Sequence, residues 1–149
     1  MILGTWYWND ENETGFVHIG LNEDTGLLRI IMVDIDSDNE LDESEYSGHT
    51  SSLKDNSYLN IKAVRPKDDN TGYMIIKYSA KKAELGIALM ESKVIEVAVN
   101  EGKLRGSSEQ CCSSVQINEV QEKLQEFVLK YDKELFPDMK YLKKLALPK

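Results

Sequence analysis

The sequence has little of what transition-metal sites and disulfide frameworks are built from. It holds two histidines, His18 and His49, and two cysteines, the neighbours Cys111 and Cys112. Adjacent cysteines cannot close an ordinary disulfide loop, so we expect free thiols in a reducing cytosol. Two isolated histidines do not make a His-rich metal site. We therefore expect no bound transition metal.

Long apolar segments are lacking as well. No run approaches the roughly 18 to 20 residues that span a bilayer. The first residues have neither the basic region nor the extended apolar region of a secretory signal. We expect a soluble, cytoplasmic protein that does not engage a membrane.

Basic residues are scarce in the first part of the chain. Residues 1–60 contain 13 Asp and Glu but only two bases, Arg29 and Lys54, whereas residues 61–149 contain 13 acids and 16 bases. Duplex binding needs clustered Lys and Arg to neutralise phosphates, so the acidic half argues against nucleic acid. Such a charge distribution suits a basic protein partner or a cation, and it is equally compatible with an ordinary solubilising surface.

Catalytic motifs are missing too. Gly106-Ser107-Ser108 does not complete the Gly-x-Ser-x-Gly pattern of a nucleophile elbow, and the paired cysteines are not a Cys-x-x-Cys redox motif. Neither a phosphate loop nor a dinucleotide fingerprint occurs. Carboxylates are numerous, but their number does not establish a juxtaposed acid and base. We expect a non-enzymatic protein without an organic cofactor.

Short apolar segments separated by polar turns dominate what is present. The chain of 149 residues, 41% hydrophobic and 30% charged, has the composition of one globular domain, residues 1–149. The nearly continuous apolar run 27–33 is typical of a strand that is buried on both faces or crosses a barrel. Turns are predicted at 22–26 and 67–72. Strands are predicted at residues 16–21, 27–33, 46–52, 59–63, 73–78, 85–90, 115–117 and 141–147.

One segment predicts an amphipathic helix. Asn118 is a good N-cap with Gln121 at the third helical position, and Pro137 ends the continuation, so we predict a helix over 118–136. Its apolar stripe comprises Val120, Leu124, Phe127, Val128, Tyr131 and Leu135. Residues 92–102 remain ambiguous, because their apolar positions fit both a strand and a helix that ends at Gly102.

A family resemblance rests on three pieces of the chain. Gly4-Thr5-Trp6 is similar to the Gly-x-Trp entry into the first strand of lipocalin-like proteins. The segment 91–104, which ends Glu101-Gly102-Lys103-Leu104, and the tail 115–145 resemble small uncharacterised bacterial lipocalin-like (calycin-type) β-barrel proteins. Within that tail, Glu122-Lys123-Leu124-Gln125-Glu126-Phe127-Val128 and Lys133-Glu134-Leu135-Phe136 carry the likeness best.

The resemblance has consequences for fold and function. It implies a mainly β fold, an antiparallel meander barrel of about eight strands, with the helix 118–136 packed on its outside and a short helix at 92–101. It supplies no catalytic residues. Many of these relatives resemble lipoproteins, but this chain has no cysteine near its start, so membrane anchoring is not implied.

The most specific local motif is acidic. Counted from Asp34, carboxylates fall at positions 1, 3, 5, 9 and 12, which matches the spacing of a calcium loop. Asn39 replaces the usual Gly at position 6, and Asn tolerates the left-handed turn required there. The preceding run reads as a strand and not as an incoming helix, which favours a solvated acidic hairpin. The calcium alternative would use Asp34, Asp36, Asp38, Asp42 and Glu45.

Two tryptophans in the first strand are the remaining candidates. Alternation places Trp6 and Trp8 on one face and Tyr7 on the other. The tryptophans either plug the base of the barrel core or face a ligand. We expect a protein that binds a small molecule in or at a barrel cavity. The alternative is an acidic interaction module that acts as an inhibitor or immunity-type partner of a basic protein.

Overall fold

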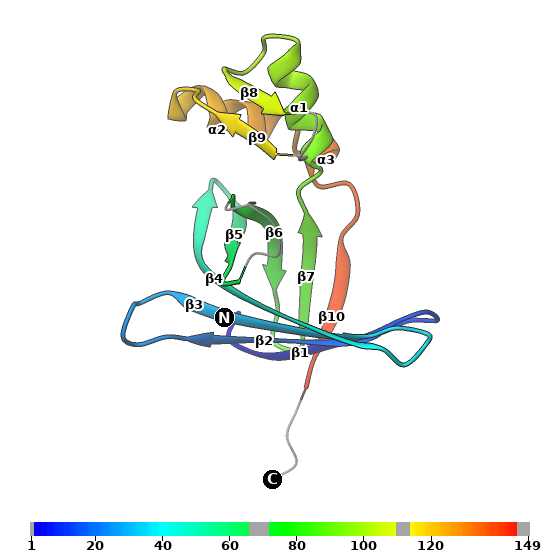
Figure 1. The fold of residues 1–149 in the computed structure, drawn as a ribbon. Helices are drawn as coiled ribbons and strands as arrows, with labels where there is room; N and C mark the ends of the chain where they lie inside the picture. Colours follow the sequence, from blue (N-terminus) through cyan, green and yellow to red (C-terminus); the bar gives the residue numbers. More distant parts are fainter. Residues whose placement is uncertain (1, 66–71, 110–113, 146–149) are drawn as a thin grey trace.

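A computed structural model describes residues 2–65, 72–109 and 114–145 (Figure 1). Within these residues the chain forms ten strands and three helices. In chain order they are β1 Gly4–Asn9, β2 Thr14–Leu21, β3 Leu28–Ile35, β4 Leu41–Leu53, β5 Asn56–Ala63, β6 Met74–Ala80, β7 Glu84–Leu89, α1 Ser92–Asn100, β8 Gly106–Glu109, β9 Ser114–Ile117, α2 Gln121–Lys130, α3 Asp132–Leu135 and β10 Lys140–Lys144.

Eight of the strands form a closed antiparallel barrel. β1 to β7 follow one another around it, and β10 closes the gap between β7 and β1. Tight turns join β2 to β3 and β6 to β7. Gly26, with φ +73°, ends the turn predicted at 22–26, and Lys81 starts the turn between β6 and β7. The prediction of a mainly β, eight-stranded antiparallel barrel is confirmed.

Side chains alternate between the inside and the outside of the barrel. Val17 and Ile19 of β2 are buried inside, whereas Phe16 and His18, which alternate with them along the strand, are exposed. The apolar run 27–33 follows the same rule: of its members only Ile30 is buried. The run therefore forms part of the barrel wall, with one face toward the core and the other toward solvent. The inner core comprises Ile2, Trp6, Val17, Ile19, Ile30, Leu59, Ile61, Ile76, Leu85 and Leu142.

The segment between β7 and β10 forms a separate layer, which we call the cap (residues 90–139). It contains α1, the β8–β9 ladder, α2 and α3, and Figure 1 shows it gathered beyond one end of the barrel ribbon. It packs against outward side chains of the barrel, among them Tyr58 of β5 and Ala88 of β7. Lys77 Nζ lies 2.8 and 2.9 Å from the two carboxylate oxygens of Asp132, which ties β6 to α3.

The helices differ in their bounds from the sequence prediction. The single helix expected over 118–136 is divided into α2 and α3, whereas α1 confirms the short helix implied at 92–101. Asn118 is not an N-cap. Its backbone N–H donates to the Arg105 carbonyl, 2.9 Å away, and this contact holds Asn118 beside the β8–β9 ladder. The helix can therefore begin only after Val120, where no side chain caps it.

The apolar stripe of the predicted helix packs as expected except at Val120, which is exposed. Phe127 and Leu135 are buried in the cap core, and Leu124, Val128 and Tyr131 pack around them. The strand expected at 115–117 is part of β9, and the last strand, expected at 141–147, is β10. β8 was not predicted. The cysteines, and all of the turn predicted at 67–72 except Gly72, lie outside the described residues.

Candidate functional site: the barrel cavity

The inside of the barrel holds a partly open cavity of about 180 Å³. Of its thirteen lining residues, eleven are aliphatic or Met, and the other two are Trp8 and Lys140. At 180 Å³ it is smaller than drug-sized ligand pockets of roughly 300–1,000 Å³. It is somewhat larger than the apolar cavity of about 150 Å³ that, in an engineered protein, stays dry and binds benzene. The apolar residues of the lining are Ile2, Val17, Ile19, Ile30, Met32, Leu59, Ile61, Ile76, Leu85, Ile87 and Leu142.

The two tryptophans predicted to share a face both point inward, but their environments differ. Trp6 is fully buried, and its indole N–H donates to the Ile2 carbonyl at 2.9 Å. Trp8 lies near the end of β1 and lines the cavity. Its indole N–H is buried and has no hydrogen-bond acceptor among the described residues. Trp6 is therefore a satisfied core residue, whereas Trp8 is the tryptophan at the cavity.

A glycine makes room for the Trp8 ring. Gly15 of β2 is the direct partner of Trp8 in the β1–β2 ladder. A Cβ on Gly15 would lie only 2.0 Å from Cζ2 of Trp8, so any side chain there would displace the indole. The absence of a side chain at Gly15 thus lets the ring lie against the barrel wall.

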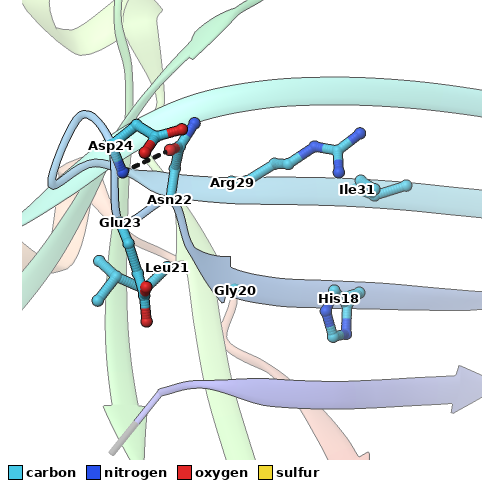
Figure 2. A pocket seen from close by; sticks show the side chains of 8 residues that line it. All are labelled: His18, Gly20, Leu21, Asn22, Glu23, Asp24, Arg29 and Ile31. Atoms are coloured by element: carbon cyan, nitrogen blue, oxygen red, sulfur yellow. Dashed lines mark hydrogen bonds between the residues drawn. The ribbon is translucent and has the colours of Figure 1, made fainter.

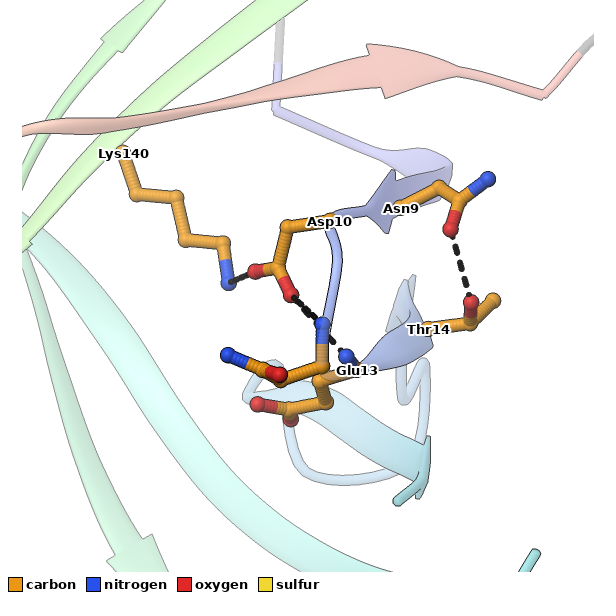
Figure 3. Close-up of polar contacts among 6 residues, drawn as sticks. Asn9, Asp10, Glu13, Thr14 and Lys140 are labelled. Carbon is orange, nitrogen blue, oxygen red and sulfur yellow. Dashed lines mark hydrogen bonds and ion pairs between the residues drawn. The ribbon is translucent and has the colours of Figure 1, made fainter. Parts of the chain in front are cut away.

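Two charged residues complete this end of the barrel (Figure 3). Lys140 begins β10 and lines the cavity, and its Nζ lies 4.8 Å from the Trp8 ring centroid, within cation–π range. The same Nζ is 3.5 Å from Oδ2 of Asp10, in the turn between β1 and β2. Asp10 therefore holds the ammonium above the indole. We call Trp8, Lys140 and Asp10 the mouth group.

The turn that carries Asp10 is internally bonded. Asp10 Oδ1 accepts the backbone N–H groups of Asn12 and Glu13, at 3.1 and 2.9 Å. Beside it, the Thr14 hydroxyl donates to the Asn9 side-chain carbonyl at 2.9 Å (Figure 3). The backbone N–H of Asn12 lowers the pKa of Asp10 below its ordinary value of 3.8, and the N–H of Glu13 and the charge of Lys140 act in the same direction. The carboxylate is thus ionised and fixed in place at neutral pH.

The five residues of the predicted calcium loop lie along the β3–β4 hairpin. Asp34 and Asp42 face each other across the ladder. Asp36 accepts the N–H groups of Asp38 and Glu40, both at 2.9 Å, within the turn. Glu45 bonds Arg29 Nε at 2.8 Å.

The hairpin brings Asp34 and Asp42 together but does not gather all five carboxylates. In the part of the chain that the structure describes, no three His, Cys, Asp or Glu side chains are grouped so that they could hold a metal ion. Asn39 adopts the left-handed conformation expected of it, with φ 60°. Calcium binding stays a prediction, and these residues form an acidic hairpin between β3 and β4.

Asp34 and Asp42 share one face of the barrel wall with Trp8. The barrel ladders align Trp8 with Gly15, Gly15 with Asp34, and Asp34 with Asp42. Because residues in one such row share a face, both positions lie on the inward side of the barrel wall. Neither residue lines the cavity.

A second cleft, of about 480 Å³, lies on the outer face of β2 and β3. Its side chains are spread along the two strands and their turn (Figure 2). His18 Nδ1 is 2.7 Å from the Thr5 hydroxyl, and Arg29 is paired with Glu45. Because these groups are already bonded to neighbours outside the cleft, they do not converge on a common ligand position. The barrel cavity is the better candidate.

Family models, curated proteins and solved structures gave no match. Among the described residues, no helix has the length and apolarity needed to cross a membrane.

Proposed function

We propose that the chain is a non-enzymatic binding protein that holds a small, uncharged, apolar molecule inside its lipocalin-like barrel. The observation that carries this proposal is the 180 Å³ cavity with its almost wholly aliphatic wall. Apart from Trp8 and Lys140 at one end, such a wall gives water no hydrogen-bond partners, so the space favours an apolar occupant. Transfer of apolar surface from water into this space supplies the binding free energy.

The size and charge of the occupant follow from the same residues. A volume slightly above that of a benzene-binding cavity fits one six-membered ring with a small substituent. A charged group on the ligand would lose its hydration without gaining partners from the aliphatic wall. The Asp10 carboxylate beside Lys140 repels anions, and the Lys140 ammonium already lies over the Trp8 ring, where a cationic ligand would otherwise stack.

Toluene is a suitable probe of this proposal. We expect saturable binding that shifts the methyl NMR signals of cavity residues such as Ile19 and Ile61, because these side chains line the space. Benzoate and benzylamine, which have the same ring but carry opposite charges, should bind at least about tenfold more weakly, since desolvating either charge is costly.

A matched pair of variants locates the binding site. Val17 lines the cavity, whereas Val33 lies on the neighbouring strand β3 and alternates with the inward Met32. Val17→Phe should fill the space and abolish toluene binding, whereas Val33→Phe should leave it unchanged. Wild-type protein that shows no saturable shift, or a Val17→Phe variant that binds as well as wild type, would refute the proposal.

The acidic hairpin supports a second candidate, an interaction module for a basic protein. Residues 34–45 contain seven Asp and Glu and no base, and within the described chain the hairpin's ion pair is the one between Glu45 and Arg29. Partners retained on immobilised wild-type protein at about 0.15 M salt should be lost from an Asp38→Asn, Glu40→Gln, Glu43→Gln variant. If the triple variant retains the same partners, the hairpin is not their binding surface.

A further inference from the structure

Trp8 has a hydrogen-bond donor that the described residues leave unsatisfied in its present position. Its indole N–H is buried without an acceptor among the described residues, whereas that of Trp6 is bonded to Ile2. A buried donor that loses its water partner without a replacement raises the free energy of that state. Exposure to water would give the Trp8 N–H an acceptor, so movement of this ring gains a hydrogen bond. Movement of Trp6 would instead break its bond to Ile2.

Trp8 packs against the inner core, and three further contacts oppose its movement. Gly15 provides the flat seat on which the ring lies. The Lys140 ammonium covers the ring at 4.8 Å, and Asp10 holds that ammonium at 3.5 Å. Asp10 is itself fixed by two backbone N–H groups of its turn. None of the three contacts is an aliphatic packing contact deep in the core, and two of them come from exposed, charged side chains.

Backbone pairing makes up most of the wall around the cavity. Eight strands pair around the barrel, and the shortest ladder is that of β1 with β10, which pairs Trp6 with Lys144 and Tyr7 with Lys143. Further along the inner side of β1, Trp6 is fully buried and tied to Ile2. Trp8 and Lys140 border the cavity beyond the last pair of the β1–β10 ladder, Tyr7 with Lys143, so side chains form the boundary between the two strands there.

We propose that Trp8 is the gate of the barrel cavity and that Lys140, positioned by Asp10, is its latch. Molecules enter and leave when the indole lifts off Gly15 and its N–H reaches water. The ligand part of this inference rests on the proposed function, whereas the ring movement can be measured without any ligand.

The first measurement follows the two indole N–H groups by hydrogen exchange in ligand-free protein. The Trp8 N–H should exchange at least about tenfold faster than that of Trp6, because gate opening exposes it to water. Lys140→Met keeps the apolar stem of the side chain but removes the latch, and should speed Trp8 exchange a further several-fold while leaving Trp6 unchanged. Lys143→Met, on the same strand but not in the mouth group, is the matched control and should change neither rate. Equal protection of both tryptophans, with no response to Lys140→Met, would overturn the gate.

The second measurement is the dissociation rate of toluene by NMR exchange. Asp10→Asn, whose side chain does not line the cavity, should raise it several-fold with little change in Kd, because a gate alters entry and exit alike. Gly15→Ala, which removes the seat, should raise it most. Toluene binding at the same rate in all variants would refute the gate and leave the proposed function standing. No toluene binding, together with Trp8 exchange that responds to Lys140→Met, would refute the proposed function and leave the gate standing.

Discussion

Strands β5 to β7 carry a hydrophobic core on each face, and the two cores are packed differently. The inner one is built mainly from aliphatic side chains such as Ile61 and leaves about 180 Å³ unfilled. The outer one, beneath the cap, contains aromatic rings, with Tyr58 and Phe136 centroids 5.7 Å apart. The diameter of a closed barrel is set by its strand number, so the wall cannot shrink onto its contents. Helices joined by loops can settle onto a sheet until the contacts are filled.

The largest expected effect comes from emptying the cap core. Phe127 is buried there, so Phe127→Ala should lower the free energy of unfolding by about 3–5 kcal/mol. Leu124 is only partly buried, so Leu124→Ala should cost less, at about 2 kcal/mol. Urea unfolding at neutral pH measures both. Midpoints equal to that of the wild type would show that the helices do not pack on the barrel.

Enlarging one side chain in each core should give effects of opposite sign. Ala88 is buried beneath the cap, so Ala88→Val should overpack that core and destabilise the protein by about 1–3 kcal/mol. Val17 faces the cavity, so Val17→Leu should place one more methylene in empty space and stabilise the protein by up to about 0.8 kcal/mol. Thermal unfolding of the two variants tests the contrast, which fails if both shift stability in the same direction.

A smaller effect is expected from one carboxylate in each region. Asp10 at the barrel mouth and Glu119 in the cap each accept two backbone N–H groups. The Val120 N–H, followed by that of Arg105, lowers the pKa of Glu119 below its ordinary value of 4.5, as those of Asn12 and Glu13 do for Asp10. NMR titration should place the midpoints below 4.5 and 3.8 respectively.

The sign of the linked stability follows from these lowered values. Because each folded-state pKa lies below the unfolded one, the contribution is fully present above the unfolded pKa and is lost as pH falls through the folded pKa. Asp10→Asn and Glu119→Gln should therefore differ most from wild type above about pH 5 and approach it in acid. A difference that grows as the pH is lowered would contradict this account.

The smallest effect is expected for calcium. Asp36 is bonded within its own turn and Glu45 is paired with Arg29, so the hairpin carboxylates are not poised around one ion. Sub-millimolar calcium should raise the melting temperature no more than magnesium does. A calcium-specific rise that disappears in an Asp34→Asn, Glu45→Gln double variant would instead establish a cation site in the hairpin.

Local patterns in the sequence predict most of the fold but little of the mouth. Strict alternation places Trp6 and Trp8 inside, because a closed barrel separates its two faces along every strand. The start of α2 could not be predicted, since Asn118 is held by Arg105, a contact made only in the folded cap. β8 lacks the apolar alternation by which a strand is detected.

The latch residues carry no local signal at all. Lys140 and Asp10 stand far apart in the chain, and each reads as a surface charge. They meet because β10 pairs with β1, and local sequence patterns do not indicate the register of that pairing.

The position of the cap has a consequence for how the chain folds. Closing the barrel pairs Tyr7 with Lys143, and a contact between such distant residues carries a large loop-closure entropy and slows folding. Until β10 arrives, β1 and β7 are open edges that can pair with another chain. The cap shortens this search, because the Glu91 N–H bonds the Leu135 carbonyl at 2.7 Å and so brings the two ends of the 90–139 segment together beside β7. A cap that forms early therefore acts as a splint, delivering the closing strand to its place and limiting the time during which the open barrel can aggregate.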